Sequence, residues 1–342
     1  MGDKLDDGVH AGVKIRGRML RSALPFLVLA LSFGSEAGAE TPPPTTPPAP
    51  ATITPKFSWA PGLKANVSFT TSRTRVVDKR TTTATEGRYT LTVLAEGPNL
   101  RMHLSDPKLG KKGAPAPDSM TQARIIEQLA AMAPDFVVAR SGEFVKIHDL
   151  SGFQGRIKTF FTEHVPKDTD STVAKNVLDM VSSEAFLTSK IADEWNAIVG
   201  SWLGGVEMQL GQEYETTARE PIPMMPGEQV VMRHTFSASR LVDCGRGGGK
   251  RDCVELVFTS RTDPEDTKQV LEAALSRLGA KALEGMVFKS IEIETKILVV
   301  TEPNALLPHR YKLTKTVRGV AAIGQEERTL EQIDERETTY EW

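Results

Sequence analysis

Two cysteines bound a glycine-rich stretch, CGRGGGKRDC, from Cys244 to Cys253, and this segment is the one most similar to a nucleotide-binding motif. A P-loop requires a glycine at its first position and, after its lysine, a Ser or Thr hydroxyl that binds magnesium. Cys244 and Arg251 occupy those two positions here. The residues that follow, VELVFTS, alternate as a strand does and do not begin a helix. The pattern therefore predicts a β-hairpin closed by a Cys244–Cys253 disulfide, whose basic turn is a candidate contact for an acidic partner.

The other residues that could do chemistry are dispersed. The sequence contains neither G-x-S-x-G nor H-E-x-x-H, and its 6 histidines show no ligand-like spacing. His103 and His234 fall on predicted strands, one outward and one inward, and we interpret Asp193 and Glu194 as solvated carboxylates. We therefore expect no catalytic residue, no metal and no cofactor. A hydrolase whose active site is assembled from distant residues is the alternative that these patterns leave open.

The N-terminal region is typical of an exported protein. Arg18 and Arg21 precede an uncharged apolar run, ALPFLVLALSF, and Ala37-Gly38-Ala39 supplies small residues for cleavage. The run has about eleven residues, whereas a membrane-spanning helix needs roughly 20. We predict a signal peptide over residues 1–39, with Met19 as the candidate true start, and no membrane span after cleavage. A membrane-anchoring helix is the alternative.

Residues 40–56, ETPPPTTPPAPATITPK, predict an extended tether, because proline fixes φ and removes a backbone donor. We place the protein in the periplasm or outside the cell, where disulfides persist, and without a lipid anchor because no cysteine lies near the cleavage site. Lys and Arg number 42 against 44 Asp and Glu, a formal charge of -2, and aromatic residues make up 6%. We therefore expect neither bulk attraction to nucleic acid nor a base-stacking platform.

Alternating hydrophobic residues after Phe57 predict strands, beginning with LKANVSF and RYTLTV. The C-terminal part of the chain alternates in the same way, and three long strands are expected there, over 286–301, 309–320 and 325–341. Strands and helices do not alternate regularly, which argues for an antiparallel sheet and against a parallel one. A sheet of about eight to ten such strands must curl.

The middle of the chain predicts helices. They are expected from about Asp118, over 153–165, as a pair over 171–202, and after Asp263, a candidate N-cap followed by Pro264. The sequence therefore predicts one α+β domain over 57–342 with a helical insertion at about 118–205. In this fold a large curved antiparallel sheet, a half-open β-barrel, has helices packed on its concave face.

The apolar stripe of the middle helices has two interpretations. In the first, its side chains seal the sheet and the core is filled. In the second, the seal is incomplete and leaves a cavity suited to an acyl chain or another apolar ligand. The candidates for lining such a cavity are Phe69, Tyr89, Phe160, Phe161, Trp195, Trp202, Met232 and Phe236.

The order of elements resembles the LolA/LppX-like superfamily of envelope lipoprotein carriers: a signal segment, an antiparallel meander, mid-chain helices, one later helix and a closing run of strands. The stretch PHRYKLTKTVRGVAAIGQEERTLEQIDERETTYEW also resembles uncharacterised secreted bacterial proteins related to that superfamily. The resemblance implies an unclosed barrel with an apolar inner face and a role in handling lipid or lipoprotein. No motif aligns position by position, so no family site residue is transferred.

Two functions are consistent with the sequence. The first is an exported, non-catalytic binding protein that holds a lipid or other apolar ligand in the cell envelope. The alternative is a structural or interaction protein of the envelope, with a filled core, no ligand and an envelope protein as its partner. Whether the concave face is filled or partly empty decides between them.

Overall fold

The computed structural model describes residues 51–76, 79–112, 128, 132–164, 171–221, 229–245, 252–277, 286–323 and 326–342. Four predicted features lie outside these ranges: the signal peptide over 1–39, most of the tether, most of the helix expected from Asp118, and the basic tip of the cysteine hairpin. The sheet, the remaining helices and the cysteine pair lie inside them.

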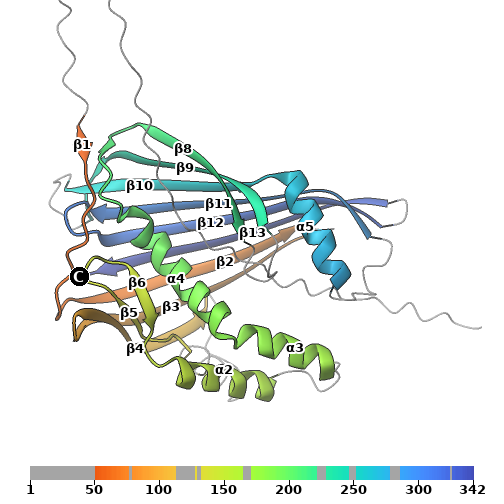
Figure 1. Ribbon diagram of the computed structural model, residues 1–342, viewed down its shortest axis with the longest axis horizontal. Coiled ribbons are helices and arrows are strands. Elements are labelled where there is room, and N and C mark those ends of the chain that lie inside the picture. The colour runs from red at the N-terminus through yellow and green to blue at the C-terminus, as the bar shows by residue number, and fades with distance from the viewer. Residues whose placement is uncertain are drawn as a thin grey trace, which may run out of the picture.

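A large antiparallel sheet dominates the fold (Figure 1), which confirms the predicted α+β class. In spatial order its 11 strands are β6 (Phe144–Ile147), β5 (Phe136–Val138), β4 (Asn99–Lys111), β3 (Arg80–Glu96), β2 (Lys64–Val76), β13 (Glu326–Glu341), β12 (Leu307–Ile323), β11 (Met286–Glu302), β10 (Cys253–Thr262), β9 (Gln229–Val242) and β8 (Glu213–Pro221). The sheet is open, because β6 and β8 stand at its two edges. It has one strand more than the upper end of the expected range.

The two ends of the described chain meet at the middle of the sheet. Strand β2 pairs with β13, so that Val67 stands opposite Tyr340 and Ala65 follows on the same face. A second, two-stranded sheet joins β1 (Thr52–Ile53) to β7 (Met208–Gln209). The last residues of the predicted tether are therefore hydrogen-bonded to the folded body.

Four α-helices have described bounds: α2 (Leu150–His164), α3 (Ser171–Val181), α4 (Glu184–Ile198) and α5 (Pro264–Arg277). Helix α4 crosses one face of the sheet, here called the inner face, and a short 3-10 helix, η1 (Gly200–Trp202), follows it (Figure 1). Asp263 caps α5 as predicted, because its Oδ1 accepts the backbone N–H groups of Glu265 and Asp266. Within the described ranges, no helix combines the length and the apolar character required to cross a membrane.

An aromatic cluster fastens α4 to the sheet. The ring of Trp195 lies 5.4 Å from Trp59 and 5.5 Å from Phe136, both edge-on, and Trp59 also packs edge-on against Trp342 at 5.1 Å. Trp195 Nε1 donates a hydrogen bond of 2.7 Å to the carbonyl of Gly142. Because edge-to-face pairs add to the free energy of burial, this cluster anchors the helix at one end of the inner face.

The turn between β5 and β6 fits closely beneath this cluster. Gly142 has a φ of 98°, and a Cβ built on it would lie 2.6 Å from Leu203 Cδ2 and 2.7 Å from Phe57 Cγ. Both the backbone conformation and the lack of space require glycine here. The turn at Ser141-Gly142 is therefore also a packing position under α4.

We expect Gly142→Ala to destabilise the protein more than Gly62→Ala, which serves as a matched control. Gly62 has a nearly equal φ of 95° but no atom within 4 Å of a built Cβ. The control should lose about 1–2 kcal/mol from backbone strain, and Gly142→Ala about 1–3 kcal/mol more from overpacking. Urea unfolding of both variants measures the difference, and equal losses would contradict the close fit.

The disulfide predicted between Cys244 and Cys253 is present and links the end of β9 to the start of β10. Beyond it, β9 and β10 pair from Cys253 opposite Val242 to Thr262 opposite Met232. Strands β9 and β10 therefore form the β-hairpin that the sequence indicated, and a strand rather than a helix begins at Cys253.

Replacing Cys244 with serine should lower the free energy of unfolding by about 2–3 kcal/mol under oxidising conditions, because the unfolded chain loses a crosslink over a short loop. Thermal unfolding with and without a thiol reductant measures this effect. In reductant the variant and the wild type should unfold at the same temperature. A difference that persists undiminished in reductant would show that the serine acts other than by removing the disulfide.

Candidate functional site

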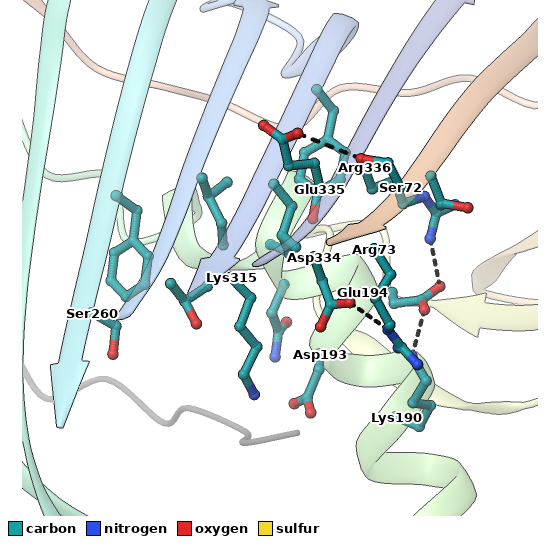
Figure 2. Close-up of a pocket in the computed structure, with 18 of the residues that line it drawn as sticks. Ser72, Arg73, Lys190, Asp193, Glu194, Ser260, Lys315, Asp334, Glu335 and Arg336 are labelled. Atoms are coloured by element: carbon teal, nitrogen blue, oxygen red, sulfur yellow. Dashed lines mark hydrogen bonds and ion pairs between the residues drawn. The ribbon is translucent and has the colours of Figure 1, made fainter. Parts of the chain in front are cut away.

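A cavity of about 400 Å³ lies between the inner face of the sheet and α4, and we call it the central cavity. Its apolar lining includes Phe258, Ile297, Leu313 and Met232, which come from β9 to β12. Polar residues from α4, β2 and β13 form the opposite wall, as Figure 2 shows. The cavity therefore combines an apolar floor with a charged wall.

A second cavity of about 380 Å³, the aromatic cavity, lies on the other side of α4. Its lining includes Trp195 from α4, Phe153 from α2, and Phe69, Tyr89 and Tyr340 from the sheet. Burial raises the pKa of Tyr340 well above its ordinary value and raises that of Tyr89 as well. Both phenols therefore stay neutral near pH 7, and the cavity offers aromatic rings beside the charged residues that share its lining.

An ion cluster separates the two cavities, because Lys190, Glu194, Tyr311 and Arg336 line both of them. Lys190 Nζ lies 2.6 Å from Glu194 Oε1, and Arg336 Nη1 lies 3.5 Å from Glu194 Oε2 (Figure 2). Burial alone would lower the pKa of Arg336, but Glu194 and the neighbouring tyrosines together outweigh burial and raise it. Both cations therefore share one carboxylate at the boundary.

Asp193 precedes Glu194 on α4 but differs from it in its contacts. Its carboxylate lines the central cavity, and among the described residues it makes no hydrogen bond or ion pair. Its pKa is raised to about 7, chiefly by burial and also by the charges of Glu194 and Glu220, whereas Lys190 and Lys315 oppose the shift. Asp193 thus changes its charge near neutral pH inside the cavity.

A buried polar group lies at the β8–β10 end of the central cavity. His234 Nε2 donates a hydrogen bond of 2.9 Å to Glu220 Oε1, and both side chains are 2% exposed. Ser260, which lines the cavity, stands directly opposite His234 in the β9–β10 register. Ser260 Oγ, His234 Nδ1 and Glu220 Oε2 are all buried and have no hydrogen-bond partner.

The structure distributes the eight predicted lining residues unevenly. Phe69, Tyr89 and Trp195 line the aromatic cavity, and Met232 lines the central cavity. The other four lie elsewhere: Trp202 is in the buried core, Phe236 stacks on Tyr214, and Phe160 and Phe161 are half-buried on the last turns of α2. Helix α2 packs through the earlier Phe153, and Phe160 stacks on His164 instead. Whether any of the eight contacts a ligand stays a prediction.

The charged residues of the cavities were not predicted. The interpretation of Asp193 and Glu194 as ordinary solvated carboxylates was wrong for Asp193, whose pKa is raised. Glu194 is 42% exposed, but the interpretation missed its ion cluster with Lys190 and Arg336. One signal was available, because Glu194 follows Ile191 by three residues and therefore lies beside the apolar stripe of the helix. Nothing local indicated that Arg336, far along the chain, would meet it.

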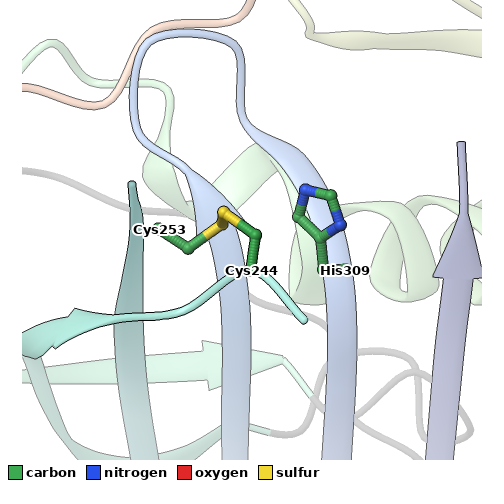
Figure 3. A group of neighbouring side chains, drawn as sticks. All are labelled: Cys244, Cys253 and His309. Atoms are coloured by element: carbon green, nitrogen blue, oxygen red, sulfur yellow. A yellow bond between two sulfur atoms is a disulfide. The ribbon is translucent and has the colours of Figure 1, made fainter. Parts of the chain in front are cut away.

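The disulfide and His309 form a further group of potential metal ligands, drawn in Figure 3. Their nearest ligand atoms lie within 4.8 Å of one another. Both sulfurs are joined in the disulfide, however, and metals are bound by thiolates. His309 Nε2 lies 3.0 Å from Glu302 Oε1, so this histidine is held by a carboxylate. In its oxidised form the group is a structural contact.

Comparisons with known proteins leave the family open. No family model matches the sequence, and no curated protein matches it. Two solved structures are similar over most of the chain. One, described as lipid-protein interactions in lipovitellin, has a TM-score of 0.37 and 9% identity over 83% of this chain and 25% of that one. The other, an outer membrane channel from Pseudomonas putida F1, has a TM-score of 0.18 and 6% identity over 84% and 98%.

This chain therefore spans about a quarter of the lipovitellin chain. Both TM-scores are too low to carry an argument about function. Neither structure is a carrier of the LolA/LppX-like superfamily, and that resemblance is not confirmed.

We expect Asp193→Asn to stabilise the protein above neutral pH and to have little effect near pH 4. The folded-state pKa of about 7 lies above the ordinary value of 3.8 for an aspartate, so stability is lost as the pH rises through this window. Asparagine cannot ionise and avoids this loss, which is at most about 4 kcal/mol. Urea unfolding at several pH values between 4 and 8 measures the gain.

The control for this prediction is Glu215→Gln on strand β8, outside both cavities. The Glu215 side chain is 58% exposed and lies 3.2 Å from Arg233. This variant removes a negative charge without relieving burial and should show no comparable gain between pH 4 and pH 8. A gain for Asp193→Asn that does not vary with pH would contradict the raised pKa.

Proposed function

We propose that this protein is an exported, non-catalytic binding protein that holds a lipid or another apolar ligand between its curved sheet and helix α4. The single observation that carries the proposal is the pair of cavities beside α4, with volumes of about 400 and 380 Å³. Ligand cavities are typically about 300–1,000 Å³ and largely apolar, with a few polar groups that orient the ligand. Both cavities have this composition.

The geometry of the sheet explains why the inner face is not filled. Strands lie about 4.8 Å apart, so 11 strands extend over roughly 50 Å, whereas a helix is about 10–12 Å wide. Helix α4 therefore covers only part of the inner face, and space remains on both of its sides. This favours a ligand-binding protein over the alternative, an envelope interaction protein with a filled core.

Export is supported by two independent features. The N-terminal apolar run is typical of a signal peptide, and the Cys244–Cys253 disulfide is stable only in an oxidising compartment such as the periplasm or the cell exterior. The two features agree, and a protein that binds lipid in the envelope must reach that compartment.

The absence of a chemical step is inferred from the cavity wall. A serine nucleophile requires a hydrogen bond from its hydroxyl to a neighbouring base. Ser260 stands opposite His234, yet neither Ser260 Oγ nor His234 Nδ1 has a hydrogen-bond partner. We therefore assign these residues to binding and name no cofactor.

Protein expressed with its N-terminal segment and purified from the periplasm should carry an apolar ligand that native mass spectrometry detects. Leu313→Trp should strongly reduce the bound fraction, because the indole fills the central cavity that Leu313 lines. The matched control is Thr314→Trp, since the next residue of a strand points to the opposite face. A ligand-free wild type would favour the interaction-protein alternative, and equal loss in both variants would contradict binding in this cavity.

A further inference from the structure

Polar groups without a hydrogen-bond partner line the part of the central cavity between α4 and β10. The half-buried carboxylate of Asp193 projects from α4 without a hydrogen bond or ion pair among the described residues, and Ser260 lies at the β10 side (Figure 2). Ser260 Oγ is buried without a partner, and so are His234 Nδ1 and Glu220 Oε2 behind it. Buried polar atoms in folded proteins nearly always have a partner, so these three buried atoms indicate a missing ligand or water.

The chemistry of these atoms selects the missing partner. With Glu220 as the acceptor, the proton of the hydrogen bond lies on His234 Nε2, and Nδ1 is an acceptor when the ring is neutral. A carboxylate only accepts when it is ionised, and the hydroxyl of Ser260 can do either. The group that satisfies this end of the cavity must therefore donate hydrogen bonds.

The nearby cations are already engaged. Lys190 is bound to Glu194 at 2.6 Å, Arg73 is bound to Asp334 at 2.6 Å, and Lys315 also has an interaction partner. Two carboxylates, those of Asp193 and Glu220, are close enough for the charge of one to raise the pKa of the other. This end of the cavity therefore offers acceptors and negative charge to a ligand.

We propose, building on the binding role above, that the ligand of the central cavity is an amphiphile with a hydrogen-bond-donating head, best a protonated amine. The ammonium lies against Asp193 and Ser260, and its apolar chain extends along Phe258, Ile297 and Leu313. An alkyl carboxylate of the same length is disfavoured, because its oxygens would face acceptors and like charges. A neutral alcohol is intermediate, since it donates one hydrogen bond without a charge.

The charge of Asp193 makes this recognition dependent on pH. The groups that face Asp193 are Lys190 and Glu194 on α4, Glu220 on β8 and Lys315 on β12. Because its pKa is raised to about 7, Asp193 gains its negative charge as the pH rises from 6 to 8. An alkylamine stays protonated over this range, as lysine does, and should therefore bind more tightly at pH 8 than at pH 6.

The experiment compares three probes that share one alkyl chain: dodecylamine, dodecanol and dodecanoate. Isothermal titration calorimetry on the full chain, with each probe below its micelle concentration, measures the dissociation constants at pH 6 and pH 8. At pH 8 we expect dodecylamine to bind about tenfold more tightly than dodecanoate, as a charge-assisted hydrogen bond implies. Asp193→Asn should weaken the binding of dodecylamine by about the same factor and leave the binding of dodecanol almost unchanged. Glu215→Gln, at a carboxylate that lines neither cavity, should alter the binding of neither probe.

Each outcome bears on a different statement. If dodecanoate binds as tightly as dodecylamine, or Asp193→Asn leaves the amine affinity unchanged, the donor-head assignment is overturned while the binding role stands. If none of the three probes binds, the proposed function fails and this assignment fails with it. Circular dichroism of Asp193→Asn tests whether the variant is folded. Ser260→Ala provides a second variant that should also weaken the binding of dodecylamine.

Discussion

The edge-to-face packing of Trp195 against Trp59 is the contact on which the arrangement of this protein depends. It fixes α4 to one end of the inner face, where Phe136 and Trp342 complete an aromatic cluster. The indole N–H of Trp195 is satisfied by the carbonyl of Gly142, so burial of its polar atom costs little. With the helix held there, the residues of its other faces are placed against the sheet at fixed positions.

The width of the sheet then determines what surrounds the other faces of α4. A single helix cannot cover 11 strands, and the inner face remains partly open on both sides of α4. On one side the wall is aromatic, and on the other it is charged. The ion cluster of Lys190, Glu194 and Arg336 stands between them. A ligand that entered both cavities would pass these paired charges, which separate two different chemical environments.

Much of the fold could be predicted because it depends on local patterns. The alternation in β11, β12 and β13 places every second side chain on the inner face, and their bounds lie within a few residues of those expected. The cap of α5 at Asp263 follows from side-chain chemistry within one turn. The disulfide could be predicted because two cysteines in a short segment have few other partners. The candidate site was only partly foreseen: aromatic residues such as Phe69 and Trp195 stood out by their apolar periodicity, whereas Arg336 and Glu220 carried no local signal.

The sequence by itself determined the class of fold, the order of its elements, the cysteine hairpin and the apolar stripe of α4. Each of these results from interactions between residues near one another along the chain, and such interactions have a readable period or spacing. Only the tertiary structure decided that Glu194 meets Arg336, that His234 meets Glu220, and that Asp193 faces a cavity without a partner. These contacts join segments that are distant in the sequence. They depend on how much of the wide sheet one helix can cover, and no local sequence pattern encodes that.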